Sequence, residues 1–173
     1  MSNATNRSIA ILGSARSDGN TARVLARLVD GLPCDTLDLS RQRIAEFSYA
    51  QAYADGDEFL AIVERIVAAP VTILATPVYW YSYSAPMKRF VDRFTDLLFA
   101  HKPLGRKLRG RRFALLSTGS DPKPDELLNA AYRGFCNYLS ITNLGIAYAQ
   151  EDGPFHDEEI VAAIRREIAS AAR

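Results

Sequence analysis

The strongest constraint on the fold is a regular alternation of short apolar segments with longer amphipathic ones. The apolar runs are typical of buried strands and fall at 8–13, 34–39, 71–76, 113–117 and 141–149, the last with a possible break at 143–145. Between them, apolar residues recur at helical spacing over 20–31, 57–70, 84–98, 125–139 and from 157 onward. The pattern predicts an α/β fold with a five-stranded parallel sheet covered on both faces. Right-handed crossovers favour the doubly wound strand order 2-1-3-4-5, in three α/β/α layers.

The length and the charge balance narrow the class of protein. A chain of 173 residues fits one domain, which we expect over residues 8–173 after a flexible leader at 1–7. The 21 Lys and Arg residues balance 20 Asp and Glu residues, which weighs against a nucleic-acid partner and against an acidic electron carrier. The longest apolar stretch, 66–75, is short of the roughly 20 residues of a membrane span, so we expect no membrane partner.

The cysteines point to a reducing compartment. Cys34 and Cys136 lie far apart, and no His/Cys cluster has the spacing of a zinc or iron–sulfur site. We therefore expect no metal and a cytoplasmic location.

Ligands of such sheets bind beyond the carboxyl ends of the strands, so the loops after the first, third and fourth strands are the candidates. The first loop, 13–21, carries hydroxyls at Ser14 and Thr21, an amide at Asn20 and a guanidinium at Arg16. It leads into a helix N-terminus, where free N–H groups and the helix dipole favour an anion. A bound phosphate is the functional interpretation, and an ordinary polar turn is the alternative. Neither GxxxxGK[ST] nor GxGxxG is present.

The second candidate loop is rich in aromatic residues, and the third consists of small residues. The second, 76–84, gathers three tyrosines and the only tryptophan, around Pro77, Val78, Tyr79 and Trp80. It could receive a flat aromatic ligand, or form a packed cluster or a subunit interface. In the third loop, Gly119 allows close approach of the backbone, while Thr118 and Ser120 can donate hydrogen bonds. A plain turn is the alternative there. Together the loops favour a planar phosphorylated ligand.

Three motifs in this order carry a resemblance to a known family. They are Gly13-Ser-x-Arg-x-x-Gly-Asn-Thr21, Thr76-Pro-Val-Tyr79 and Ser84-Ala-x-Met-Lys-x-Phe-Val-Asp-Arg93. The chain resembles the NADPH-dependent FMN reductase family of flavodoxin-like proteins, which includes quinone, azo-dye and metal-ion reductases. The resemblance runs from about Ser8 to Gly119. The compact cysteine motif of the related iron–sulfur flavoproteins is missing, so the chain looks like a cluster-free member.

The resemblance implies an FMN site. It assigns the FMN phosphate to Ser14, Arg16, Asn20 and Thr21. The loop along the isoalloxazine ring matches Pro77, Val78, Tyr79 and Trp80, and the loop near the pyrimidine edge matches Thr118, Gly119 and Ser120. The third loop departs from many relatives, which have more glycines there.

The resemblance also implies an activity. NAD(P)H would pass hydride to flavin N5 and leave, and a small acceptor such as a quinone would take its place in a ping-pong cycle. No protein residue need be catalytic, because the flavin carries the chemistry. A homodimer or homotetramer is expected from relatives that complete the site across an interface. The rivals are a flavodoxin-type electron carrier and a flavin-free interaction domain of the same fold.

Two further segments stay open. The basic run at 102–112 could meet the 2′-phosphate of NADPH or an acidic partner, and a solvated connection is the ordinary interpretation. The aromatic residues Phe47, Tyr49 and Tyr53 could cover the flavin, pack against a partner or anchor their long loop.

Overall fold

The computed structural model describes residues 7–171 and contains one sheet with five long strands. All neighbouring pairs of these five strands are parallel. The spatial order is β2-β1-β3-β5-β6, which confirms the predicted 2-1-3-4-5 order once the short extra strand is set aside. The long strands are β1 (Ser8–Leu12), β2 (Cys34–Asp38), β3 (Val71–Tyr79), β5 (Arg112–Gly119) and β6 (Thr142–Gln150).

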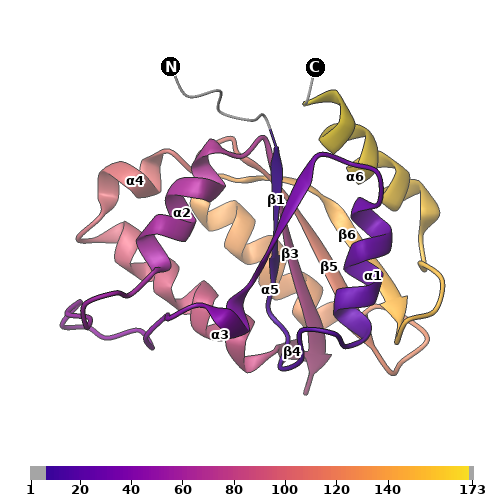
Figure 1. Cartoon of the computed structure of the whole chain (residues 1–173), viewed down its shortest axis with the longest axis horizontal. Coiled ribbons are helices and arrows are strands. Elements are labelled where there is room, and N and C mark those ends of the chain that lie inside the picture. The colour runs from indigo at the N-terminus through magenta and orange to yellow at the C-terminus, as the bar shows by residue number, and fades with distance from the viewer. Residues whose placement is uncertain (1–6, 172–173) are drawn as a thin grey trace.

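Helices cover both faces of the sheet (Figure 1). The α1 and α6 helices bury Val24, Leu28 and Ile164 in a core on one face. The α2, α3 and α5 helices bury Phe59, Phe90 and other apolar residues in a larger core on the other face. The helices are α1 (Asn20–Val29), α2 (Phe59–Ala68), α3 (Ala85–Asp92), α4 (Lys102–Arg106), α5 (Glu126–Leu139) and α6 (Glu158–Ser170).

Local rules set several helix starts. The side chains of Ser84, Asp125 and Asp157 accept backbone N–H groups at the starts of α3, α5 and α6. The expectation of one helix over 84–98 is wrong in its second half, because Arg93–Leu98 forms a 3-10 helix. The expected break in the last strand is confirmed: its register shifts opposite Phe113–Leu115, and Gly145 has a φ of 130°.

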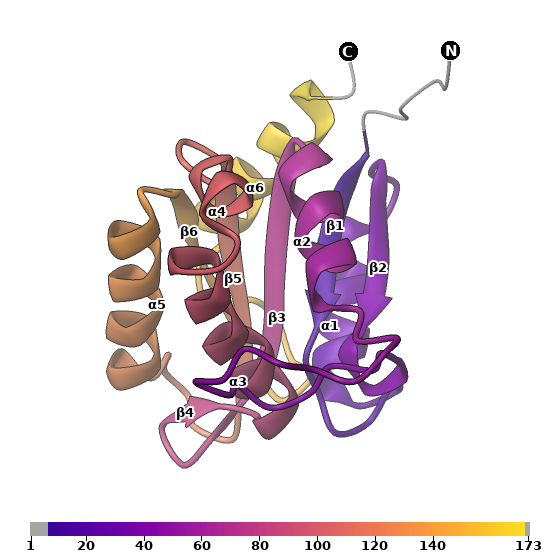
Figure 2. The same ribbon diagram turned by 90° about the vertical axis from the view of Figure 1, so that its left-hand side faces the viewer.

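The sequence pattern did not predict a short hairpin at the end of β3. Strand β4 (Ser82–Tyr83) pairs antiparallel with Val78 and Tyr79 and projects beyond the carboxyl edge of the sheet (Figure 2). Its two turn residues, Trp80 and Tyr81, have φ values of 49° and 62°. Left-handed φ at two successive bulky residues is strained, typically by about 1–2 kcal/mol each.

A buried arginine anchors the long segment 42–58. Arg93 is 1% exposed, and its guanidinium contacts the carboxylates of Asp57 at 2.7 Å and Asp96 at 2.8 Å. The ring of Tyr53 lies 3.5 Å from the guanidinium carbon, and its hydroxyl donates to Asp96 at 2.9 Å. For Tyr53 the structure therefore supports loop anchoring. Phe47 and Tyr49 pack edge to face, and Tyr49 is 94% exposed.

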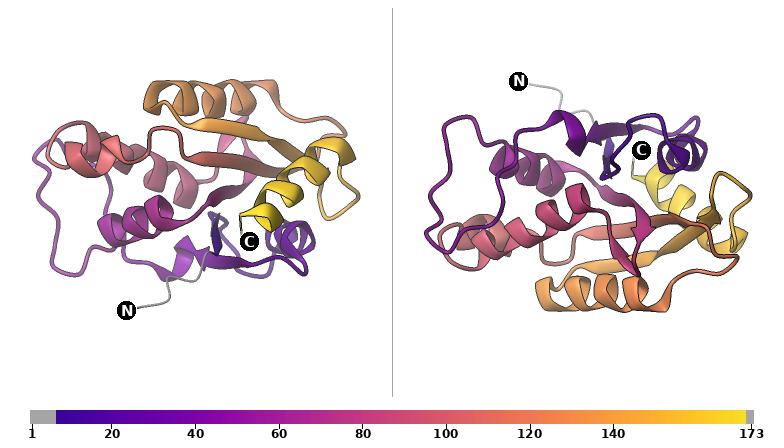
Figure 3. Two further views of the ribbon diagram at one scale, coloured as in Figure 1. Left: turned by 90° about the horizontal axis from the view of Figure 1, so that it is seen from above. Right: turned by 90° about the horizontal axis from the view of Figure 1, so that it is seen from below.

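The two ends of the sheet differ in character. The carboxyl ends of the strands and the β3–β4 hairpin lie at one end, and α4 lies at the other (Figures 1 and 2). Figure 3 views the molecule from these two ends and shows the helices on either side of the sheet. The basic run 102–112, which begins with α4, is thus far from the loops that follow the strands. The structure does not support its contact with a coenzyme bound at those loops.

Two sequence expectations concern the termini and membranes. Residues 1–6 of the expected leader lie outside the described residues, whereas Arg7 pairs with Asp35 at 2.7 Å. Within residues 7–171, no helix combines the length and apolar character that a membrane span requires.

Candidate functional site

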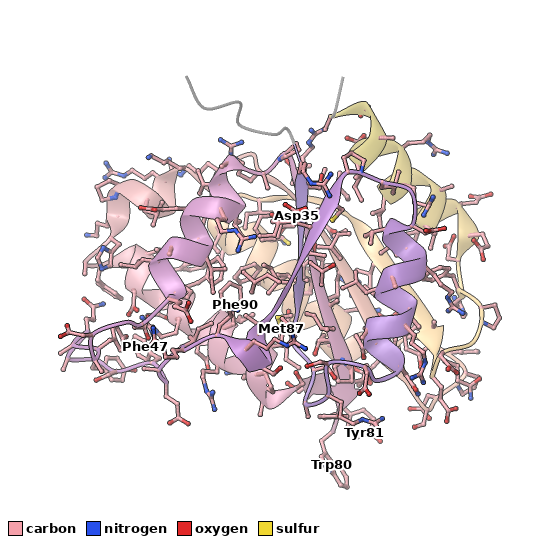
Figure 4. The ribbon with its side chains drawn as sticks, in the orientation of Figure 1. Asp35, Phe47, Trp80, Tyr81, Met87 and Phe90 are labelled. Carbon is pink, nitrogen blue, oxygen red and sulfur yellow. The ribbon has the colours of Figure 1, made fainter. Side chains whose placement is uncertain are left out.

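The loops that follow β1, β3 and β5 meet around one hollow of about 340 Å³. Ten of the eleven residues singled out from the sequence line it. The exception is Trp80, whose side chain is 93% exposed and points away from the body of the molecule (Figure 4). The lining consists of Ser14, Arg16, Gly19, Asn20, Thr21, Pro77, Val78, Tyr79, Thr118, Gly119, Ser120 and Glu151. We call this hollow the central site.

The first loop delivers hydrogen-bond donors to the start of α1. Helix α1 begins after Gly19, and no side chain caps it there. Its first N–H groups therefore face the central site with the positive end of the helix dipole. The Arg16 side chain lies over the same point, because a Cβ at Gly19 would lie 3.5 Å from Arg16 Nε. This combination of N–H groups, dipole and guanidinium suits an anion.

Buried hydroxyls lock the three loops together. Thr21 Oγ1 and Thr118 Oγ1 share a hydrogen bond of 2.6 Å between α1 and the end of β5. Ser84 Oγ donates to the Gly13 carbonyl at 2.5 Å, and Thr76 Oγ1 accepts the Ser84 N–H at 3.1 Å. Since all these hydroxyl groups are buried, the walls of the site are held in place before any ligand binds.

The third loop brings its backbone close to a tyrosine. A Cβ at Gly119 would lie 3.0 Å from Tyr148 Oη, closer than ordinary contact. The Tyr148 hydroxyl donates to the Asp121 carbonyl at 2.5 Å, and Gln150 Nε2 donates to the Ser120 carbonyl at 2.8 Å. Burial and the nearby carboxylates of Asp121 and Asp125 raise the pKa of Tyr148, so it stays a neutral donor.

A second hollow of about 280 Å³ adjoins the central site. It shares Val78, Gly119 and Ser120 with the central site, and Trp80 and Lys123 border it as well. Trp80 therefore lies at the rim of this second hollow, next to the central site that the other ten predicted residues line.

Sequence reasoning missed two lining residues, Gly19 and Glu151. Glu151 follows β6, has a φ of 51°, and donates its N–H to the Gly119 carbonyl at 2.7 Å. The rule that ligands bind past the carboxyl ends of strands also covers the loop after the last strand, and would have found it. Across the described stretch 7–171, no group of three or more His, Cys, Asp or Glu side chains could hold a metal ion.

The chain is similar in sequence to members of one known family. The family model described as NADPH-dependent FMN reductase matches residues 7–150. YwqN of Bacillus subtilis, provisionally named an NAD(P)H-dependent FMN-containing oxidoreductase, is 33% identical over 93 residues. That alignment spans 51% of this chain and 51% of YwqN, about half of each protein.

Solved structures share the fold. The Trp repressor binding protein from Bacillus subtilis superposes with a TM-score of 0.71 at 23% identity, over 92% of this chain and 99% of that one. An FMN-dependent NADH-azoreductase from Bacillus anthracis, solved with FMN, gives a TM-score of 0.61 at 12% identity, over 96% and 97%. At these identities the likeness shows the fold alone.

Proposed function

The chain belongs to the NADPH-dependent FMN reductase family, and from that membership we propose that its central site binds FMN for an NAD(P)H-dependent reductase activity. One observation carries the proposal: hydrogen-bond donors that suit a phosphate and the β3 end with Pro77, Val78 and Tyr79 line the same hollow. The family match indicates which cofactor to expect, and the three loops contain the residues that we propose bind it.

The donor set of the central site fits FMN. The N-terminus of α1 with the Arg16 guanidinium suits a phosphate dianion. Gly119 has no side chain and a Cβ there would lie 3.0 Å from Tyr148 Oη, so the backbone itself forms this part of the wall and a ring could lie close to it. A volume of about 340 Å³, with a further 280 Å³ adjoining, lies in the range of cofactor sites.

Each loop has its own proposed part in holding the cofactor. The first loop would bind the phosphate through Ser14, Arg16, Asn20 and Thr21. The β3 end would flank the ring through Pro77, Val78 and Tyr79, and the third loop would meet its edge through Thr118, Gly119 and Ser120. Trp80 would stand at the outer rim, where an acceptor enters or a partner subunit packs.

FMN, when bound, supplies the redox chemistry by taking hydride from NAD(P)H and giving electrons to an acceptor. The protein's part is to hold the ring and to keep one side open to exchange the two substrates in a ping-pong cycle. The adjoining hollow is bordered by Trp80 and Tyr81, which suits a small aromatic acceptor such as a quinone. Exposed Trp80 also suits a homodimer or homotetramer interface, which light scattering coupled to size exclusion would test.

The first test is the visible spectrum of the purified protein, with chromatography of the chromophore released by heat. A yellow protein that releases FMN and oxidises NADPH with a quinone supports the proposal. A protein that stays colourless after FMN is added would overturn it and favour a flavin-free interaction domain. FMN binding without NAD(P)H oxidation would favour an electron carrier.

Arg16→Ala tests the phosphate assignment. It removes a charge-assisted contact worth about 1.5–3 kcal/mol, so the Kd for FMN should rise roughly tenfold or more. Arg41→Ala is a matched control, because its guanidinium pairs with Asp38 and lies outside the central site. Equal FMN affinity in Arg16→Ala and Arg41→Ala would show that Arg16 does not bind the phosphate.

A further inference from the structure

A separate cavity of about 380 Å³ opens at the edge of the sheet beside β6. Its walls come from α5, from the irregular part of β6 and from the start of α6. We call it the edge cavity. Neither the family motifs nor the proposed flavin site uses its residues, apart from its border at Tyr148.

The edge cavity contains an unsatisfied buried amide. Asn129, on α5, is 5% exposed, and its side-chain Oδ1 is buried with no hydrogen-bond partner among the described residues. Buried amide oxygens in folded proteins are nearly always paired, so an unpaired one needs an explanation. A ligand that brings an N–H donor to this oxygen would provide it.

Cationic and imidazole groups stand near this amide. Arg133 lies one turn further along α5, and its guanidinium forms an exposed ion pair with the Glu126 carboxylate at 3.3 Å. His156 lies on the opposite wall and is fixed by its backbone N–H, which donates to the Tyr148 carbonyl at 2.8 Å. The carboxylate of Asp157, on the same wall, accepts the N–H groups of Glu159 and Ile160. Arg133 and His156 thus suit an anionic group.

The remaining wall is largely apolar. Gly145 has a φ of 130°, and a Cβ there would lie 2.9 Å from Ile160 Cγ2. A side chain at this position is excluded, so β6 and α6 approach each other closely. Ile146, Ile160 and Pro124 line the cavity around this contact. Apolar walls with a few polar groups are typical of sites for small molecules and cofactors.

The edge cavity borders the second hollow. Tyr148 lines both the edge cavity and the second hollow, which itself shares three residues with the central site. The second hollow therefore adjoins both the central site and the edge cavity. A long ligand with a reactive ring at one end could occupy the second hollow and the edge cavity together.

We propose that the edge cavity binds the adenylate end of NAD(P)H. The exocyclic amino group of adenine would donate to Asn129 Oδ1, its ring would lie against Gly145 and Ile160, and a phosphate would meet Arg133. This inference rests on the proposed function, since it gives that same reductase a place for the coenzyme. Its residues lie beyond Arg93, where the last of the three family motifs ends, although the family model matches up to residue 150.

The test uses AMP and adenosine as probes, by calorimetry on the purified full chain. AMP binding needs no flavin, so it is measured whether or not FMN binds. We expect Asn129→Leu to weaken both probes roughly fivefold or more, through loss of one hydrogen bond. Arg133→Gln should weaken AMP by a similar factor and leave adenosine unchanged. Asn137→Leu, the same change at an exposed position of α5, is the control and should bind both probes normally.

Thermal unfolding and enzyme kinetics distinguish a specific binding defect in Asn129→Leu from misfolding of that variant. Asn129→Leu removes an unpaired buried polar group, so its unfolding temperature should equal or exceed that of the wild type. In the FMN-loaded enzyme, the same variant should raise the KM for NADPH while kcat and the Kd for FMN stay unchanged. AMP should compete with NADPH.

Three results would overturn the proposal. These are no AMP binding by the wild type, equal AMP affinity in Asn129→Leu and Asn137→Leu, or AMP binding that does not compete with NADPH. Failure of the proposed function would look different, since the protein would then fail to bind FMN at all.

Discussion

The close packing of Gly13 against α3 makes an alanine substitution there a sharp test of how rigid the central site is. The Gly13 N–H donates to the Ala75 carbonyl at 2.8 Å, and its own carbonyl accepts the Ser84 hydroxyl. A Cβ at Gly13 would lie 2.7 Å from Met87 Cβ and 3.0 Å from Met87 Cα. Met87 is fully buried in the first turn of α3 (Figure 4). The clash is with atoms near the backbone, so the loop or the helix must move.

The magnitude follows from this overpacking. Inserting a methyl group into a packed core costs about 1–3 kcal/mol. For a chain of this length, 1 kcal/mol shifts the unfolding temperature by about 2–4 °C, so we expect Gly13→Ala to lower it by roughly 2–12 °C. Movement of the first loop should also weaken FMN binding.

Gly134→Ala supplies the matched control. Gly134 lies inside α5, and a Cβ there would meet nothing within 4 Å. Alanine is better than glycine in a helix by about 1 kcal/mol, so this variant should unfold about 2–4 °C higher. The same glycine-to-alanine change is thus expected to lower the unfolding temperature at position 13 and to raise it at position 134.

Thermal unfolding followed by circular dichroism, with FMN titration by fluorescence quenching, measures both effects. If Gly13→Ala unfolds at the wild-type temperature and binds FMN equally well, α3 can shift to make room for the methyl group without loss of stability. The reasoning that locked loops shape the central site would then be wrong.

Three further predictions concern the buried ion pairs and the hairpin. Arg93→Met leaves the carboxylates of Asp57 and Asp96 without their buried partner, so urea unfolding should show a loss of about 3–5 kcal/mol, and an unmeasurable loss would contradict this. Burial opposes ionisation of Asp57, yet hydrogen bonds from Arg93 and from backbone N–H groups hold its pKa below the ordinary 3.8. A carboxylate with a lowered pKa stabilises the folded state above about pH 4, and this stabilisation is lost as pH falls through the folded-state pKa. The difference in free energy of unfolding between wild type and Asp57→Asn should therefore shrink in acid. A difference that stays constant with pH would refute the assignment. Trp80→Gly relieves a left-handed φ at an exposed position and should raise the free energy of unfolding by about 1 kcal/mol; a drop would show that the indole packs against something, such as a partner subunit.

Much of the fold could be predicted from the sequence because its signals are local. Apolar runs and helical spacing marked the long strands and helices, and Ser84, Asp125 and Asp157 marked helix starts through contacts three residues away or fewer. The strand order followed from the handedness of crossovers. The three loops could then be assigned to one edge of the sheet, which brought ten predicted residues together in one hollow.

What only the tertiary structure decided depends on contacts between distant residues. The β3–β4 hairpin has left-handed φ at Trp80 and Tyr81, whereas sequence preferences favour Gly or Asn at such turn positions. The change to a 3-10 helix at Arg93 coincides with its ion pair to Asp57, 36 residues away in the sequence. Asn129 carries no local signal either, since it lines a cavity only after β6 pairs with β5. The strand-end rule covers the loop that holds Glu151, but its hydrogen bond to Gly119 forms only because β6 lies beside β5. Periodicity reports which face of an element is buried, whereas these positions are fixed by which elements meet across the sheet.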